Sequence, residues 1–280
     1  MQLAKEIIAG RRNISPEEVE VLTAALRDEY KNLPNLVEIP DESTIFVGDL
    51  HGDLPCANKI TKLFLSSSDN LIFLGDYADR GPQQINTFNL VMALAIQYPE
   101  RVMMLRGNHE SELVTRVYGF YQEIVRQYGE EMYQIYCNVF KELPLAGMSK
   151  TGAFACHGGV AENLNSIDQI QSINRKNVDI VDPIAFQLTW NDPRDGDFEF
   201  GENFRGGGSR IFGRIAFDKF SKNLGVRLMF RAHQVFPDGV KFFFDRKLVS
   251  VFSSTYTNRV KAKVVRMEKE STLTTIDLLD

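Results

Sequence analysis

The strongest constraint on the fold is a repeated pattern in which a short apolar run is followed at once by glycine and polar residues. The runs cover residues 44–47, 71–74, 102–105, 153–156 and 228–230. Short runs of β-prone residues bounded by glycine or polar residues are typical of buried strands. The segments 57–65 and 83–98, which separate the first three runs, have the length and composition of crossover helices. This alternation predicts an α/β layered sheet.

The N-terminal part is predicted to be helical. Ser15 and Glu18 form a Ser-x-x-Glu capping box, and Pro16 suits a first helical turn. We therefore expect a helical segment over about 15–32. Apolar spacing predicts a second helix over 124–140.

The second half of the chain is expected to mix loops and strands. Residues 191–213 are dense in Asp and Gly and lack periodicity, which predicts a long surface loop. Its acidic stretch 192–197 lacks the ligand spacing of a calcium loop and is expected to be solvated. Alternating β-branched and aromatic residues predict strands over 241–253 and 259–267, arranged as an antiparallel meander within a C-terminal strand region of about 240–280.

Composition limits the class of protein. The 280 residues carry a net charge of −5, so no overall positive field draws the chain to nucleic acid or anionic lipid. The three cysteines follow no disulfide framework, which suggests free thiols in a reducing compartment. The N-terminus lacks a signal-peptide core, and no run approaches the roughly 18 apolar residues that cross a bilayer. With no repeat or long linker, residues 1–280 are expected to form a single cytoplasmic domain with no nucleic-acid or membrane partner.

Each apolar run ends in a polar cluster, and all four histidines lie in these clusters. In chain order the clusters read GDLHGD from residue 48, GDYADRG from 75, RGNHE from 106, HGG from 157 and RAHQ from 231. In open α/β sheets, ligands bind beyond the carboxyl ends of strands. A single histidine there is most often a hydrogen-bonded structural residue, but four of four favour one shared site.

The residue types in these clusters suit metals and phosphate. Asp, His and Asn are ligands for Mn, Fe or Zn, and none of these sites needs cysteine. Two cations about 3.5–4 Å apart need a shared oxygen ligand, so one carboxylate is expected to bridge them. Arg80 and Arg106 lie in the same clusters, and guanidinium groups match phosphate oxygens bidentately. These features predict a two-metal site acting on phosphate esters.

The five blocks resemble, in order and spacing, the signature blocks of the PPP family of serine/threonine protein phosphatases. The similarity covers about residues 14–254 and includes RVYGFY, LTWNDP, GEN…RGG and VFSS. The resemblance implies the calcineurin-like metallophosphoesterase fold, an α/β (α+β layered) structure of two packed mixed β-sheets flanked by helices. The compact tail looks more like that of prokaryotic or archaeal members. The implied reaction is hydrolysis of phosphoserine and phosphothreonine in phosphoprotein substrates, by direct in-line attack of a hydroxide that two divalent metal ions activate.

The resemblance also implies roles for individual residues. One metal would be held by Asp49, His51 and the bridging Asp76, and the other by Asp76, Asn108, His157 and His233. Phosphate would be held by Arg80, Arg106, Asn108 and Arg205. His109, oriented by Asp79, would be the general acid. Manganese is the metal expected in vitro, with iron or zinc as alternatives.

Tyr256 resembles an active-site tyrosine of the family, but residues 252–257 run one residue out of register with the family block and contain no cysteine. This departure leaves the role of Tyr256 open. The resemblance does not say which regulatory subunits the chain binds.

The same residues bear on other possible functions. A diadenosine-polyphosphate or other small-phosphoester hydrolase with the same core remains an alternative. A cysteine-dependent phosphatase is excluded, because the residues six positions after the cysteines are Lys62, Leu143 and Glu162, and none is arginine. A superfamily nuclease is disfavoured because the last block is RAHQ. A scaffold without turnover is disfavoured because all six proposed metal ligands and the acid are present.

Overall fold

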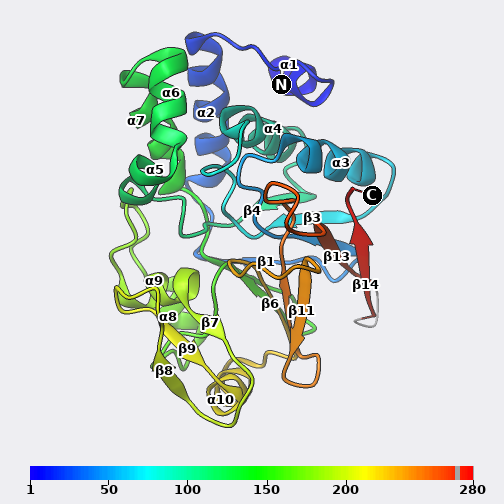
Figure 1. Ribbon diagram of the computed structural model, residues 1–280, viewed down its shortest axis with the longest axis vertical. Helices are drawn as coiled ribbons and strands as arrows, with labels where there is room; N and C mark the ends of the chain where they lie inside the picture. Colours follow the sequence, from blue (N-terminus) through cyan, green and yellow to red (C-terminus); the bar gives the residue numbers. More distant parts are fainter. Residues whose placement is uncertain (269–271, 280) are drawn as a thin grey trace.

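The computed structural model describes residues 1–268 and 272–279, and two packed β-sheets of mixed direction form its centre (Figure 1). The five-stranded sheet has the order β14-β13-β2-β3-β4, in which β2, β3 and β4 are parallel and β13 is antiparallel to both its neighbours. Its strands are β2 (Thr44–Val47), β3 (Asn70–Phe73), β4 (Val102–Met104), β13 (Lys263–Met267) and β14 (Leu273–Asp277).

The six-stranded sheet has the order β1-β5-β6-β10-β12-β11. Strand β10 is parallel to both β6 and β12, whereas β5 and β11 are antiparallel to β6 and β12 respectively. Its strands are β1 (Leu36–Glu38), β5 (Ala146–Met148), β6 (Ala153–Cys156), β10 (Leu228–Arg231), β11 (Val240–Phe243) and β12 (Leu248–Val251).

The two sheets meet through a shared apolar layer. Phe46 of β2 stacks on Phe230 of β10, with ring centroids 3.6 Å apart, and Ile72 and Val249 belong to the same buried cluster. Burial of these side chains is the main favourable term that holds the layers together. The register of each strand is therefore fixed, because a one-residue slip would turn its apolar side chains outward.

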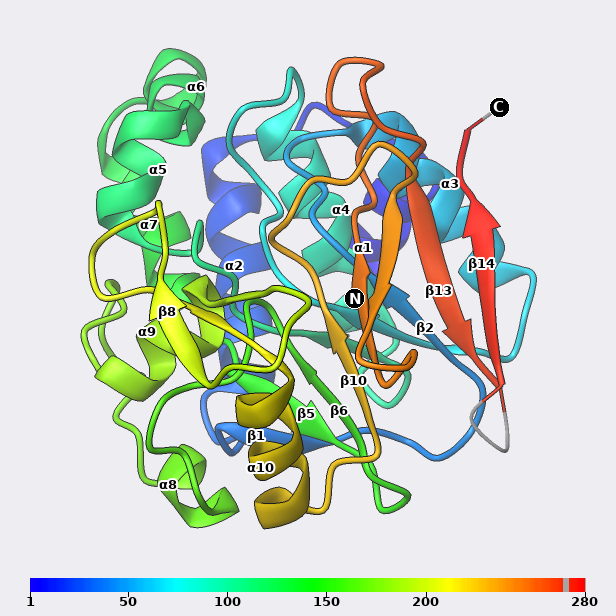
Figure 2. The ribbon, with the colours of Figure 1, turned by 60° about the horizontal axis from the view of Figure 1, so that its bottom comes forward.

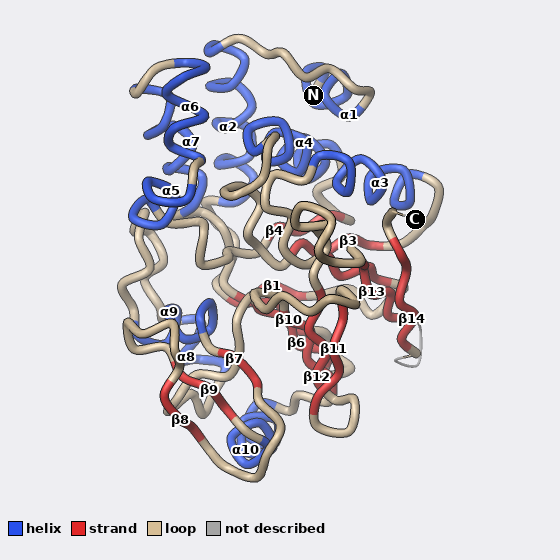
Figure 3. The backbone as a smooth tube through the Cα atoms, in the orientation of Figure 1, coloured by secondary structure: helices blue, strands red, loops and turns tan. Residues whose placement is uncertain are grey.

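Helices cover the outer faces of both sheets, as the colouring in Figure 3 shows. A second buried cluster joins the five-stranded sheet to the helices above it in Figure 1, and a third joins the six-stranded sheet to helices below. The upper helices are α1 (Gln2–Ile8), α2 (Pro16–Tyr30), α3 (Leu54–Leu65), α4 (Gln84–Gln97), α5 (Glu112–Tyr118), α6 (Phe120–Tyr128) and α7 (Glu131–Phe140). The lower helices are α8 (Ile167–Gln171), α9 (Pro183–Trp190) and α10 (Arg214–Leu224). Among the described residues, none of the helices combines the length and apolarity of a membrane span.

Most predicted elements are confirmed. The runs 44–47 and 153–156 coincide with β2 and β6, and the capping box at Ser15 begins α2, with the Glu18 amide donating to the Ser15 hydroxyl and the Glu18 carboxylate accepting from the Ser15 amide. The helix predicted over 124–140 is instead two helices, because Gly129, at φ 96°, ends α6.

Two predictions about the second half were wrong. Residues 191–213 are not a simple surface loop but contain a three-stranded sheet of β7 (Asp192–Pro193), β8 (Phe200–Glu202) and β9 (Arg210–Phe212). The C-terminal strands do not form one meander, because β12 joins the six-stranded sheet. Strands β13 and β14 join the other sheet, where β13 pairs with β2 (Figure 2). Residues 269–271 and 280 of the predicted C-terminal region lie outside the described residues.

Candidate metal centre

The polar clusters that follow five strands converge on one cavity. The carboxyl ends of the parallel strands β2, β3 and β4 share one edge of their sheet, and β6 and β10 likewise end together in the other. The cavity has a volume of about 350 Å³. Its lining includes Asp49, His51, Asp76, Arg80, Asn108, His109, Tyr118, Trp190, Phe204, Arg205, His233 and Val235.

Two groups of potential ligands share the Asp76 carboxylate. In the first group the ligand atoms of His51, Asp76 and His109 all lie within 4.8 Å of one another, and in the second those of Asp76, His157 and His233 do. An Asp76 carboxylate oxygen lies 3.7 Å from His51 Nε2 and 3.3 Å from His157 Nε2. Asp76 is therefore the carboxylate that is positioned to serve two cations at once.

Neighbouring side chains complete each group. A carboxylate oxygen of Asp49 lies 3.5 Å from His51 Nε2, and the Asn108 side-chain oxygen lies 2.8 Å from His157 Nε2. Gly107 packs so closely that a Cβ there would overlap the Asp76 carboxylate. Both groups are almost fully buried.

The imidazole orientations fit metal binding. His51 Nδ1 lies 2.9 Å from the Ala78 carbonyl and His157 Nδ1 lies 3.0 Å from the Leu74 carbonyl. A carbonyl only accepts, so each Nδ1 donates to it, and each Nε2 is left facing Asp76 as the atom that would bind a metal. His233 Nε2 is buried without a hydrogen-bond partner, as expected for an atom that needs a ligand. These residues fit divalent cations.

Burial and charge set the protonation states of the site. Burial alone would raise the pKa of Asp76, but the charges of His157 and His109 bring that pKa well below its usual value. Burial, aided by the Arg205 charge, brings the pKa of His233 well below its usual value. The carboxylate is therefore ionised and this imidazole neutral, which are the forms that bind metal.

His109 is held in one orientation at the edge of the cavity. Its Nδ1 lies 2.6 Å from an Asp79 carboxylate oxygen, and the other Asp79 oxygen accepts the Phe120 amide at 3.0 Å. His109 Nε2 lies 3.2 Å from Arg80 Nη2, so this nitrogen faces the same space as the guanidinium. Burial lowers the pKa of His109 below its usual value.

Of the residues predicted to bind phosphate, Arg80, Asn108 and Arg205 line the cavity. Arg205 is fixed by Asp192, which accepts from Nε at 2.7 Å, and by the His233 carbonyl at 3.2 Å. Tyr256 does not line this cavity, but its hydroxyl accepts from Arg80 Nη1 at 2.7 Å. Tyr256 thus contacts the site through Arg80.

The structure contradicts the prediction that Arg106 holds phosphate. Its side chain is buried and donates to three backbone carbonyls, those of Glu110, Arg175 and Val178. It does not line the cavity. Its guanidinium therefore anchors the chain around residues 175–178, where it is buried away from the cavity.

Sequence reasoning assigned no role to Glu110 and expected Asp192 in solvent, yet both are buried. Glu110 accepts from the amides of Asp76, Tyr77 and Gly107 at 2.8, 3.1 and 2.8 Å, so it joins the loops after β3 and β4. Asp192 pairs with Arg231 at 2.9 Å as well as with Arg205. The available signal was their position inside the RGNHE and LTWNDP blocks.

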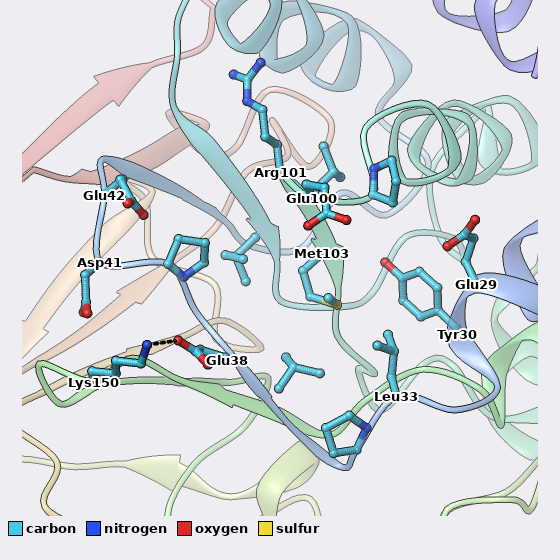
Figure 4. A pocket seen from close by; sticks show the side chains of 16 residues that line it. Glu29, Tyr30, Leu33, Glu38, Asp41, Glu42, Glu100, Arg101, Met103 and Lys150 are labelled. Atoms are coloured by element: carbon cyan, nitrogen blue, oxygen red, sulfur yellow. Dashed lines mark ion pairs between the residues drawn. The ribbon is translucent and has the colours of Figure 1, made fainter.

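A larger cavity of about 680 Å³, drawn in Figure 4, shares no lining residue with this site. It is lined by residues such as Tyr30, Leu33 and Met103, and Lys150 forms an ion pair with Glu38 at 2.9 Å on its wall. It contains none of the predicted site residues. The larger cavity is therefore not the candidate active site. The buried groups of Asp and His side chains, and not cavity volume, identify that site.

Comparison with known proteins agrees with this geometry. The calcineurin-like phosphoesterase family matches residues 43–237. The serine/threonine-protein phosphatase 4 catalytic subunit of Kluyveromyces lactis is 34% identical over 275 residues, a match that covers 95% of this chain and 87% of that protein.

Solved structures show the same fold. A protein serine/threonine phosphatase from Saccharomyces cerevisiae, similar to human phosphatase PP5, superposes with a TM-score of 0.85 at 24% identity, covering 95% of this chain and 91% of that chain. The cold-active protein-tyrosine phosphatase of a psychrophilic Shewanella species superposes with a TM-score of 0.59 at 16% identity, covering 86% of this chain and 83% of that chain.

The fold and the buried Asp and His groups define a metal-dependent phosphoesterase. The chain belongs to the calcineurin-like phosphoesterase family. Within that family it is homologous to the serine/threonine protein phosphatases.

Proposed function

We propose that this chain is a serine/threonine protein phosphatase that hydrolyses phosphoserine and phosphothreonine monoesters. The observation that carries the proposal is the Asp76 carboxylate, which two buried ligand groups share beside the His109–Asp79 pair. The 34% identity to a serine/threonine phosphatase over nearly the whole chain supports the substrate class.

We propose that the site takes two divalent metal ions, with manganese the most effective in vitro. Asp49, His51 and Asp76 would hold one ion, and the other would be held by Asp76, Asn108, His157 and His233. Bound cations supply charge that polarises a phosphoryl oxygen and lowers the pKa of a water molecule.

The chain's own side chains supply binding and a proton. Arg80 and Arg205 carry guanidinium groups on the cavity wall, where they would bind phosphoryl oxygens and neutralise charge that develops in the transition state. As the ester P–O bond breaks, the serine or threonine alkoxide needs a proton. We assign that transfer to His109 Nε2, which faces the cavity while Asp79 orients the ring.

The test compares two substrates with added Mn²⁺, a phosphothreonine peptide and diadenosine tetraphosphate. We expect the peptide to have the higher kcat/KM. The matched control is Asp76→Asn, which should lose bound metal and turnover of both. A preference for diadenosine tetraphosphate would favour the small-phosphoester alternative, and full metal occupancy in Asp76→Asn would contradict the bridging role.

We also propose a cytoplasmic location. The three cysteines are buried free thiols, a pattern that fits a reducing compartment. Fractionation of the source cells with an antibody to this chain would test it, and recovery from an oxidising compartment would contradict it.

A further inference from the structure

A second cavity, which we call the flanking pocket, adjoins the candidate metal centre. It has a volume of about 380 Å³ and shares His51 and Arg80 with the metal cavity as common walls. Pro55, Pro82 and Tyr256 contribute apolar surface to it. The mechanism above uses none of these three residues.

Positive charge dominates the polar part of the flanking pocket. Arg80 and Arg259 line it, and Arg259 is exposed and forms no ion pair with any carboxylate of the described residues. The lining carboxylate, Asp53, is occupied: it accepts from the Cys56 amide at 3.1 Å, from the Thr255 amide and hydroxyl at 2.8 and 2.7 Å, and from the Ser254 hydroxyl at 3.2 Å. Because these four bonds use the Asp53 oxygens, Asp53 does not accept hydrogen bonds from the guanidinium groups of Arg80 and Arg259.

The loop that carries Arg259 is held in a defined shape. The Thr255 carbonyl accepts from the amides of Arg259 and Val260 at 2.9 and 3.0 Å, which closes the loop on itself. Asp53 holds the other end of the loop through Thr255. Tyr256, within the loop, has a left-handed φ of 47° and bonds to Arg80. Such backbone strain is most often retained where position matters.

We propose that the flanking pocket is a substrate subsite for an anionic side chain that lies one or two residues from the phosphorylated residue. The anion is a carboxylate or a second phosphoryl group. This inference rests on the proposed phosphatase function. Because the two cavities share walls, a peptide advancing about 3.3–3.6 Å per residue can place adjacent side chains in both. A guanidinium fork binds either oxyanion, and the apolar walls suit a methylene stem.

Arg259 is the discriminating residue, because Arg80 lines both cavities whereas Arg259 lines only the flanking pocket. The experiment measures kcat/KM on phosphothreonine peptides that carry Glu, Gln, Lys or a second phosphoserine at each position within two residues of the phosphothreonine. For the wild type we expect Glu at one position to exceed Gln by about tenfold, and Lys to fall below Gln. The Glu advantage should shrink between about 0.05 M and about 0.5 M salt.

The variants separate this subsite from general electrostatics. Arg259→Gln should bring the Glu-to-Gln ratio close to one, and Arg259→Glu should reverse the preference toward Lys. The matched control is Arg126→Gln, which removes the same charge from an exposed position on α6 that lines neither cavity and should keep the wild-type ratio. The second-phosphoserine peptides show whether carboxylate or phosphoryl binds better.

The failures are distinguishable. Equal kcat/KM for Glu and Gln peptides at every position in the wild type, or an unchanged ratio in Arg259→Gln, would overturn the subsite while leaving the phosphatase proposal standing. Turnover of p-nitrophenyl phosphate without turnover of any phosphopeptide would overturn the proposed function itself.

Discussion

The His109 imidazole has a fixed environment on both sides of the ring. The Asp79 carboxylate forms a hydrogen bond with Nδ1, and Nε2 faces Arg80 and the cavity. His109 also lies within the same group of potential ligand atoms as His51 and Asp76. Geometry alone therefore allows either an acid or a ligand role, and a substitution separates them.

We expect His109→Asn to retain both metals and to lose about 10²-fold or more in kcat on a phosphopeptide, because general acid catalysis contributes about 10²–10⁴-fold. The loss should be smaller on an aryl phosphate, whose leaving group needs no proton. Steady-state kinetics on both substrates and metal analysis of the purified variant test this. Equal losses, or missing metal, would show that His109 is not the acid.

At the residue scale the sequence predicted that these polar side chains converge, because the carboxyl ends of neighbouring parallel strands meet at one edge of a sheet. It failed for Arg106. A residue's place in a motif does not give the direction of its side chain, and Arg106 turns toward backbone carbonyls while Asn108, two residues later, faces the cavity.

Arg106 also leads to a stability prediction. Arg106→Met should lower the free energy of unfolding by about 3 kcal/mol or more, because it leaves three backbone carbonyls without their donor. Urea unfolding measures the loss. The KM for phosphopeptide should change little in the folded variant, in contrast to Arg205→Met, which should raise it. A large rise in KM with unchanged stability would restore Arg106 as a phosphate ligand.

At the element scale, the three-stranded sheet of β7, β8 and β9 carries the second arginine of the site. Asp192 of β7 holds Arg205, and the same carboxylate pairs with the fully buried Arg231. A short sheet rich in Asp and Gly has almost no periodicity of its own, so sequence patterns indicated a loop. Long-range ion pairs, which no local pattern encodes, fix it in place.

We expect Asp192→Asn to reduce stability and to raise KM, since it leaves the Arg231 charge buried and frees Arg205. Breaking a buried ion pair costs about 3–5 kcal/mol. Denaturant unfolding and phosphopeptide kinetics measure both effects. Asp197→Asn is the matched control, because Asp197 is 81% exposed, and it should change neither. An Asp192→Asn variant with normal KM would show that Arg205 needs no such support.

At the scale of the whole molecule, the candidate ligands come from both sheets. Asp49, Asp76 and Asn108 follow strands of the five-stranded sheet, whereas His157 and His233 follow strands of the six-stranded sheet. The layered architecture was predictable because local alternation sets it. The assignment of the C-terminal strands to sheets was not, because alternation shows that a segment is a strand but not which strand it pairs with.

Metal removal should therefore lower the stability of the whole fold. Binding to the folded state alone adds about 2.7 kcal/mol when free metal is 100 times its Kd. We expect chelator to lower the Tm of the wild type and Mn²⁺ to restore it, as measured by differential scanning calorimetry. Asp76→Asn should respond far less to either addition. If chelator leaves the Tm of the wild type unchanged, metal binding does not contribute to the stability of the fold.

Several residues at the centre adopt the left-handed backbone region, which costs more for any of them than for glycine: φ is 44° at His51, 58° at Asp76, 66° at Asp79, 67° at Arg80 and 67° at His233. Glycine accepts this region freely, and asparagine, aspartate and histidine accept it better than other residues do. A selection for heat resistance alone would thus drift toward Gly at these positions. Such a population would keep the architecture and discard the chemistry, so any directed evolution of this chain must screen for turnover in every round.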